Sequence, residues 1–202
     1  MSTNELTIDE QIERALASCA LAPPDAKHAL RSAHFASVIF DALHARLELA
    51  ADDRRLVVLA ALFHDIGYAR DVRDHQRKSF DMLRETPLDN VSDAERDIVA
   101  AVARYHRKSL PNIEHAAFGF MSSADQRRVR RLSAVVRLAV ALDASHLGVV
   151  QSVEIQSASQ PIRLIAHATG NVEVERDRLR ENAAAFTHLT QLPIRAEIVV
   201  ER

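Results

Sequence analysis

The feature that most constrains the fold is an unbroken apolar run, LVVLAALF, from Leu56 to Phe63. Asp52 or Asp53 can cap a helix that contains this run, and Gly67 is a natural place for it to stop. A helix that is apolar on every side must be buried, so we expect it inside a bundle of other helices. The run is far shorter than the roughly 20 apolar residues that cross a bilayer, so no membrane contact is expected.

The composition also favours packed helices. The chain has 202 residues, of which 48% are hydrophobic, and this is enough for one domain or for one domain with a small appendage. Aromatic residues make up only 4%, there is no Trp, and there are 4 Gly, which together disfavour an all-β sandwich. The net charge of −2 argues against a protein that wraps duplex nucleic acid. The single cysteine, Cys19, and a polar N-terminus unlike a secretory signal suit a cytoplasmic location.

Capping and breaking residues divide the first 150 positions into helices. The capping boxes are Thr7 with Glu10, Ser92 with Glu95, and Ser123 with Gln126. The expected helices cover 7–20, 25–47, 54–65, 75–85, 92–107 and 123–147, with a short helical turn within 112–121.

The pattern changes after Gly148. The segments SVEIQ and PIRLIAHAT alternate as strands do, residues 172–190 have helical spacing, and residues 193–200 alternate again. The prediction is a mainly α chain: an N-terminal helix in 1–24, a helical bundle domain in 25–150, and a ββαβ cap in 151–202. We expect no chemistry from the cap. It would cover an edge of the bundle or pair across a two-fold axis in a homodimer, through Ile194, Ile198 and Val200.

Histidines on several helices are the candidates for chemistry. His64 and Asp65 end the buried apolar helix, where an unpaired carboxylate is costly and a divalent cation would resolve the cost. The alternative is that the two side chains only cap the helix and bind each other. His34 shares a stripe with Leu30 and Val38, so we expect it to face inward, although most histidines on such stripes belong to the core.

Two further histidines complete this group. His75 begins a helix, and His106 is in phase with Val99 and Val102. Metal sites in bundles are built from side chains on facing helices in this way. Imidazoles with a carboxylate suit Mn, Fe, Ni, Co or Zn, and Mg also remains a candidate, whereas Ca does not fit.

A histidine about 30 residues before a His–Asp pair, in a helical chain, resembles the HD phosphohydrolase superfamily. Five ordered segments narrow the resemblance: HALRSAHFASVIFDAL, LAALFHDIGYA, HQRKSFDML, DAERDIVAAVARYHRK and VRRLSAVVRLAVALDASH. Together they resemble the C-terminal helical domain of the exopolyphosphatase/guanosine-pentaphosphatase family, over about Asp25 to Val150. The family's actin-like domains have no counterpart and no glycine-rich phosphate loop is present, so the resemblance implies a free-standing version of that domain.

The resemblance implies roles for individual residues. His34 matches the first metal ligand, and His64 with Asp65 matches the HD pair, which would be catalytic. His75 and His106 match histidines that complete a second metal site in some members. The last ligand is expected to be an aspartate within a pattern like RLADALD. This sequence reads RLAVALD, with Val140 at the aspartate's position.

Asp143 is the nearest replacement for that aspartate. It follows Leu132, Val136 and Ala139 on one helical stripe, so it points roughly toward the core. It lies about one helical turn, roughly 5.4 Å, beyond Val140. Asp143 could therefore be a metal ligand only if the metal moved or through a water. The alternative is that it caps the helix or pairs with a nearby arginine.

Basic residues accompany the candidate ligands. Lys78 follows His75, Arg107 follows His106, and Arg137 precedes Val140 by one turn. Cations in these places suit an anionic substrate such as phosphate, although a solvated helix face is the simpler interpretation. The arginine-rich segment 127–131 has no aromatic residue, so sequence-specific nucleic-acid binding is not expected.

Three functions remain open on the sequence. The first is a metal-dependent phosphohydrolase acting on a phosphate ester, a nucleotide or a polyphosphate-like anion. The second is a non-catalytic regulatory module that binds polyphosphate or a guanosine polyphosphate alarmone. The third is a structural dimerisation domain.

Overall fold

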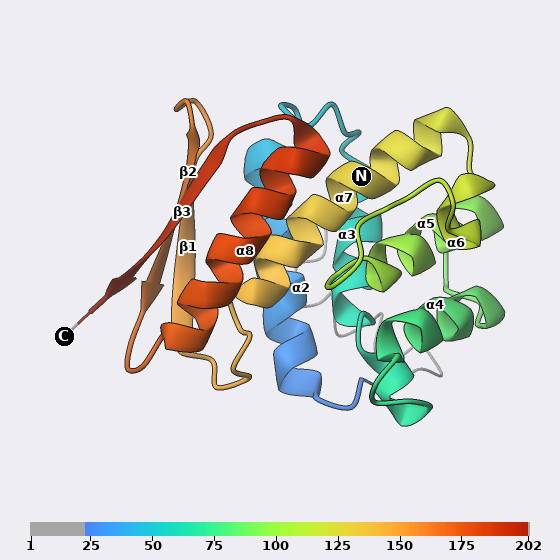
Figure 1. The fold of residues 1–202 in the computed structure, drawn as a ribbon, viewed down its shortest axis with the longest axis horizontal. Helices are drawn as coiled ribbons and strands as arrows, with labels where there is room; N and C mark the ends of the chain where they lie inside the picture. The colour runs from blue at the N-terminus through green and yellow to red at the C-terminus, as the bar shows by residue number, and fades with distance from the viewer. Residues whose placement is uncertain (1–22, 202) are drawn as a thin grey trace, which may run out of the picture.

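The structure, a computed structural model, describes residues 23–201. These residues form a helical bundle followed by a small three-stranded sheet (Figure 1). The helices of the bundle are α2 (Ala26–Leu43), α3 (Asp53–Leu62), the 3-10 helix η1 (Ile66–Ala69), α4 (His75–Glu85), α5 (Asp93–Arg104), α6 (Ala116–Gly119) and α7 (Ser123–Ala141). The expected helix 7–20, its capping box and Cys19 lie outside the described residues.

Helix α3 is the centre of the bundle, as its apolar run predicts. It packs against α2, α5 and α7, and every residue from Leu56 to Phe63 is buried. No helix of the described part is long and apolar enough to cross a membrane.

Local capping sets where the helices begin. The capping box of Ser92 and Glu95 is present at the start of α5. The expected box of Ser123 and Gln126 is wrong by one residue, because the side chain of Ser122 accepts the hydrogen bond from the backbone N–H of Asp125.

Several helices end earlier than the sequence predicts. Helix α2 ends at Leu43, α3 at Leu62, α5 at Arg104 and α7 at Ala141. After α7 a buried side chain competes with further helix, since the Asp143 carboxylate accepts a hydrogen bond from the backbone N–H of Gly148 at 2.9 Å. Gly148 adopts φ +65°, and a Cβ there would meet the Arg31 guanidinium at 3.3 Å, so glycine is favoured at this turn.

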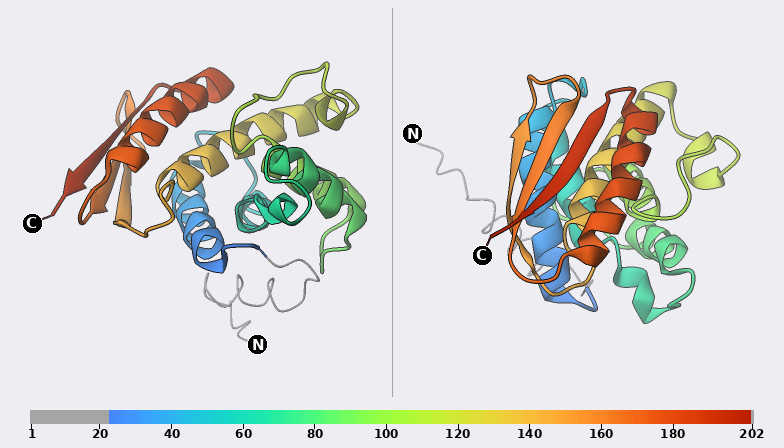
Figure 2. Two further views of the ribbon diagram at one scale, coloured as in Figure 1. Left: turned by 60° about the horizontal axis from the view of Figure 1, so that its bottom comes forward. Right: turned by 60° about the vertical axis from the view of Figure 1, so that its left-hand side comes forward.

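The C-terminal part has the predicted ββαβ order: β1 (Val150–Gln156), β2 (Ile162–Ala168), α8 (Glu173–Thr190) and β3 (Ile194–Val200). Strands β1 and β2 pair antiparallel, β2 and β3 pair parallel, and the spatial order is β1-β2-β3. Helix α8 lies between β3 and α7, and β1 runs beside α2, so sheet and bundle pack together (Figure 2).

Strand β3 has β2 as its one neighbour among the described strands, which leaves its other edge available. Ile194 and Ile198 pack against the core, whereas Val200 is exposed. A homodimer through this edge stays a prediction.

A buried ion pair links the start of α3 to α7. Asp53 is 1% exposed, and its carboxylate accepts hydrogen bonds from Arg128 at 2.5 and 3.0 Å and from the backbone N–H of Ala50 at 3.0 Å. Removing the arginine would leave a buried carboxylate without its counter-ion.

We expect Arg128→Gln to lower the free energy of unfolding by about 2 kcal/mol, less than for a fully buried pair, since Arg128 keeps 35% exposure. Urea unfolding followed by circular dichroism measures the change. The matched control is Arg127→Gln, because Arg127 is exposed on the same helix. Equal effects of the two substitutions would show that the ion pair does not stabilise this contact.

Candidate functional site

The His64–Asp65 pair lies in the turn between α3 and η1 rather than within a helix. The ring of His64 is buried, and its Nδ1 lies 2.7 Å from the carbonyl oxygen of Ala61. Ser79 of α4 fixes the turn, because its hydroxyl donates to the carbonyl of His64 at 2.7 Å and accepts from the N–H of Gly67 at 2.9 Å. A Cβ on Gly67 would lie 2.0 Å from the carbonyl oxygen of His75, so η1 can approach α4 only with glycine here.

His75 and His106 are held in the same manner. The Nδ1 of His75 lies 3.0 Å from the carbonyl oxygen of Val72, and that of His106 lies 2.7 Å from the carbonyl oxygen of Ala103. A carbonyl only accepts, so Nδ1 carries the donated proton in both rings, as it does in His64. Each neutral ring therefore presents a bare Nε2.

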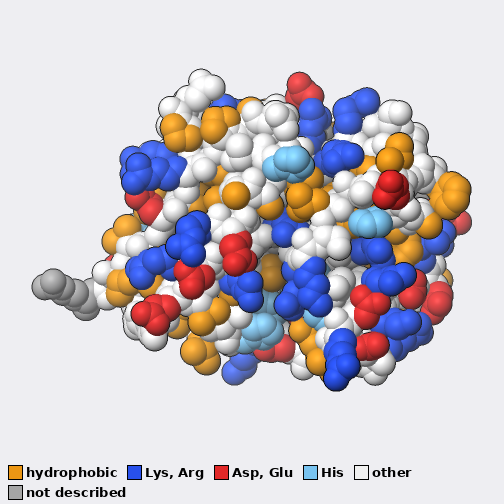
Figure 3. Space-filling view, viewed as in Figure 1, with side chains coloured by type: hydrophobic (Ala, Val, Ile, Leu, Met, Phe, Trp, Pro, Cys, Tyr) orange, Lys and Arg blue, Asp and Glu red, His pale blue; other side chains and the backbone are white. Residues whose placement is uncertain are grey.

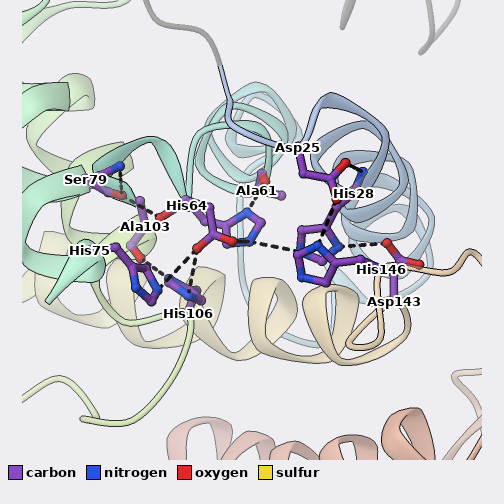
Figure 4. A network of polar contacts seen from close by, with 12 residues as sticks. Asp25, His28, Ala61, His64, His75, Ser79, Ala103, His106, Asp143 and His146 are labelled. Atoms are coloured by element: carbon purple, nitrogen blue, oxygen red, sulfur yellow. Dashed lines mark hydrogen bonds and ion pairs between the residues drawn. The ribbon is translucent and has the colours of Figure 1, made fainter. Parts of the chain in front are cut away.

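A histidine that the sequence analysis did not single out completes the cluster. His28, in the first turn of α2, is buried and its Nδ1 donates to the Asp143 carboxylate at 2.7 Å. Its Nε2 lies 3.2 Å from the Nε2 of His64 (Figure 4). Two bare nitrogens in contact repel each other unless a positive charge lies between them.

Asp65 lies among these nitrogens. Its Oδ2 is 3.2 Å from the Nε2 of His64, and its Oδ1 is 3.4 Å from the Nε2 of His75 and 3.6 Å from that of His106. Oδ1 of Asp65 and Nε2 of His75 are buried without a hydrogen-bond partner. The side chains form two sets that could each hold a metal ion: His28, His64 and Asp65, and Asp65, His75 and His106.

The pKa values fit this arrangement. Burial lowers the pKa of His28, His75 and His106, and it lowers that of His106 well below its ordinary value, so these rings are neutral donors at neutral pH. Burial also acts against the charged form of Asp65, but His64 and the other rings outweigh it and lower the carboxyl pKa. The charge of Asp65 outweighs burial at His64 and raises its pKa, so a proton or a metal ion is favoured at this point.

His34 lies elsewhere. Its side chain is exposed, so the prediction that it faces the bundle interior is wrong. Helix α2 carries the small residues alanine and serine around most of its circumference. The sequence pattern therefore allows two different stripes of the helix to be its buried face. The buried stripe is His28, Ser32, Phe35, Ile39 and Leu43.

Asp143 contacts the cluster through the Nδ1 of His28, on the side of the ring away from His64. Its Oδ2 accepts from His28 and also from Arg31 at 2.8 Å, and its Oδ1 accepts from Gly148. It belongs to neither of the two sets above. This placement favours the alternative in which Asp143 pairs with an arginine, and it adds a role in orienting His28. Burial acts to raise the pKa of Asp143, but these hydrogen bonds outweigh it and keep the group ionised.

The cluster opens into a cavity of about 330 Å³. Arg107, Lys108 and Arg137 line it together with the apolar Val140, which occupies the place of the expected aspartate. Lys78 is not among the lining residues, and its ammonium lies 3.9 Å from the Asp81 carboxylate.

Part of the cavity wall was not anticipated. Helix α8 contributes Arg178, Glu181 and Asn182, so the cap does take part in the site. Basic side chains are prominent on the face where α8 lies beside α7 (Figure 3). Two aromatic rings cover ligand candidates: Tyr68 stacks on His75 at 3.9 Å between centroids, and His146 stacks on His28 at 3.7 Å. Sequence spacing gave no signal for these contacts.

Comparison with known proteins identifies a family for this chain. A sequence profile of the family described as Ppx/GppA phosphatase, domain III, matches residues 24–190. No curated protein matches the chain. The profile covers the bundle, the cavity and α8 together, so the chain belongs to the Ppx/GppA phosphatase domain III family.

Proposed function

We propose that this chain is a metal-dependent phosphohydrolase of the HD type, acting on a phosphate ester, a nucleotide or a polyphosphate-like anion. One observation carries the proposal. The Nδ1 protons of His28, His64, His75 and His106 all point away from Asp65, so that bare nitrogens and a carboxylate face one another. A cation is the partner that this donor set lacks.

The donor set defines which ions fit. The two imidazoles on each side of Asp65, together with its two oxygens, suit Mn, Fe, Ni, Co or Zn better than Ca. Asp65 belongs to both sets, with Oδ2 beside His64 and Oδ1 beside His75 and His106. This division of its oxygens supports a pair of metal ions that share Asp65.

The remaining residues of the cavity would act on the substrate. A bound divalent cation would supply Lewis acidity toward a phosphoryl oxygen. Arg107 and Arg137 would hold the other phosphate oxygens by charge-assisted hydrogen bonds. The apolar side chains of Val140 and Ala141 would limit the access of water to that end of the cavity.

We expect metal content to depend on His28 and not on His34. Protein purified without a metal-binding tag would carry one or two equivalents of transition metal by elemental analysis. His28→Gln would lose at least one equivalent, because His28 supplies a buried Nε2, whereas His34→Gln would keep the full content, because His34 is exposed. Metal-free wild-type protein that also fails to take up Mn, Fe, Co, Ni or Zn would refute the proposal.

Asp143 provides a separate test of how His28 is held. Asp143→Asn keeps the shape but weakens the hydrogen bond to Nδ1, so we expect metal affinity to fall roughly 10–100-fold. Competition with a chromophoric chelator measures it. Asp41→Asn, at an exposed position of the same helix as His28, is the control. Unchanged affinity in Asp143→Asn would mean that the carboxylate only stabilises the turn.

We expect phosphate release to require bound metal. We expect hydrolysis of a generic phosphomonoester and of short polyphosphate to stop on chelation, to return with resupplied metal, and to be abolished in Asp65→Asn. Arg107→Gln should raise KM by about tenfold, the loss of one charge-assisted hydrogen bond, with a smaller effect on kcat. Normal hydrolysis by Asp65→Asn would contradict the assignment.

Val140 favours a second candidate function. It puts an apolar wall where an aspartate ligand is expected, which suits a module that binds a polyphosphate-like anion without turnover. Metal-loaded protein that binds such anions but releases no phosphate would select this alternative.

A further inference from the structure

Arg137 is a buried cation without a counter-ion. It is 8% exposed, and no carboxylate within residues 23–201 forms an ion pair with it. The nearby carboxylate of Glu181 is bound by Arg178 at 2.9 Å. An unpaired buried charge is costly, and a guanidinium does not lose its proton at neutral pH.

Three contacts fix the orientation of this guanidinium. Its Nε donates to Oδ1 of Asn182 on α8 at 3.0 Å, and its Nη1 donates to the carbonyl oxygens of Tyr105 at 2.9 Å and Ser109 at 3.5 Å. Its Nη2 has no partner among the described residues, and the side chain lines the cavity. Burial lowers the pKa of Arg137 to about 10, although the Glu181 carboxylate acts in the opposite direction.

Asn182 is itself held in one orientation. Its Nδ2 donates to the carbonyl oxygen of Arg178 at 2.8 Å, so Oδ1 faces Arg137. An amide at this position orients the guanidinium without neutralising its charge. A carboxylate of the same shape would orient the guanidinium and also neutralise its charge.

We propose that Arg137 and Asn182 form an oxyanion subsite in which Arg137 contacts a phosphoryl group and Asn182 is its positioning residue. The subsite joins the bundle to α8, so the cap becomes part of substrate recognition. It rests on the proposed function for its place in hydrolysis, but it binds its anion without the metal, since no candidate metal ligand touches the guanidinium. The ligand class is a tetrahedral oxyanion of the phosphate kind.

The test uses the full chain treated with chelator and titrated with inorganic phosphate in a calorimeter. We expect wild-type protein to bind phosphate, Arg137→Gln to lose binding, and Asn182→Asp to bind at least tenfold more weakly. Asn182→Asp should also raise the thermal midpoint without phosphate, because the carboxylate compensates the buried charge. Arg180→Gln, an exposed arginine elsewhere on α8, should leave both values unchanged.

In Asn182→Asp we therefore expect phosphate affinity to fall while the thermal midpoint rises, which indicates a positioning role. If Asn182 only supported the structure, the substitution would lower the midpoint instead. Absent phosphate binding in the wild type, or unchanged affinity in Asn182→Asp, would overturn the subsite. If Arg137→Gln does not fold, Asn182→Asp still decides the question. A metal-loaded, hydrolytic protein without metal-free phosphate binding would lose the subsite and keep the proposed function, whereas phosphate binding by a protein that takes up no metal would do the reverse.

Discussion

The direction in which four histidine rings donate their protons determines which ring nitrogens face Asp65 in the candidate site. In His64, His75 and His106 the acceptor of the Nδ1 proton is a backbone carbonyl three residues earlier, and in His28 it is the Asp143 carboxylate. These acceptors leave no proton for Nε2 in the neutral ring. The Asp65 oxygens lie 3.2–3.6 Å from the Nε2 atoms of His64, His75 and His106, and the Nε2 of His28 lies 3.2 Å from that of His64. A positive charge at the centre of the cluster, from a proton on His64 or from a cation, is therefore favourable.

The fold produces this pattern from the ends of helices. His64 follows α3 and His106 follows α5, and each ring binds the carbonyl of an alanine in the last turn of the helix. The carbonyl of Ala103 also accepts a longer hydrogen bond, of 3.4 Å, from the backbone N–H of His106. One side chain thus satisfies the helix terminus and directs its other nitrogen inward. The early ends of α3 and α5 are therefore part of the site, because a longer helix would occupy those carbonyls with backbone N–H groups.

The sequence predicted the order of elements better than it predicted the ligand set. The apolar run of α3, the capping box at Ser92 and the alternation in β2 are local signals, and each appears in the structure where expected. The inward face of α2 is not a local signal, because small residues allow either stripe to be buried. The choice of His34 rested on its stripe with Leu30 and Val38, on its spacing from the His–Asp pair and on the family resemblance. The contribution of α8 depends on its crossover between β2 and β3, which brings Asn182 to Arg137 across 45 residues of sequence.

Val140 changes the charge of the site as well as its ligand count. Under the proposed function, an aspartate there would compensate part of the charge of bound cations, which the valine cannot do. Asp143 restores some of this effect indirectly, since a carboxylate behind an imidazole makes that ring a stronger donor. The cavity is left more positive than a site with two carboxylate ligands, and the unpaired guanidinium of Arg137 adds to this. Under the proposed function, such a site would hold metal less tightly without substrate and would gain more from a bound phosphate, whose own oxygens would supply the missing negative charge.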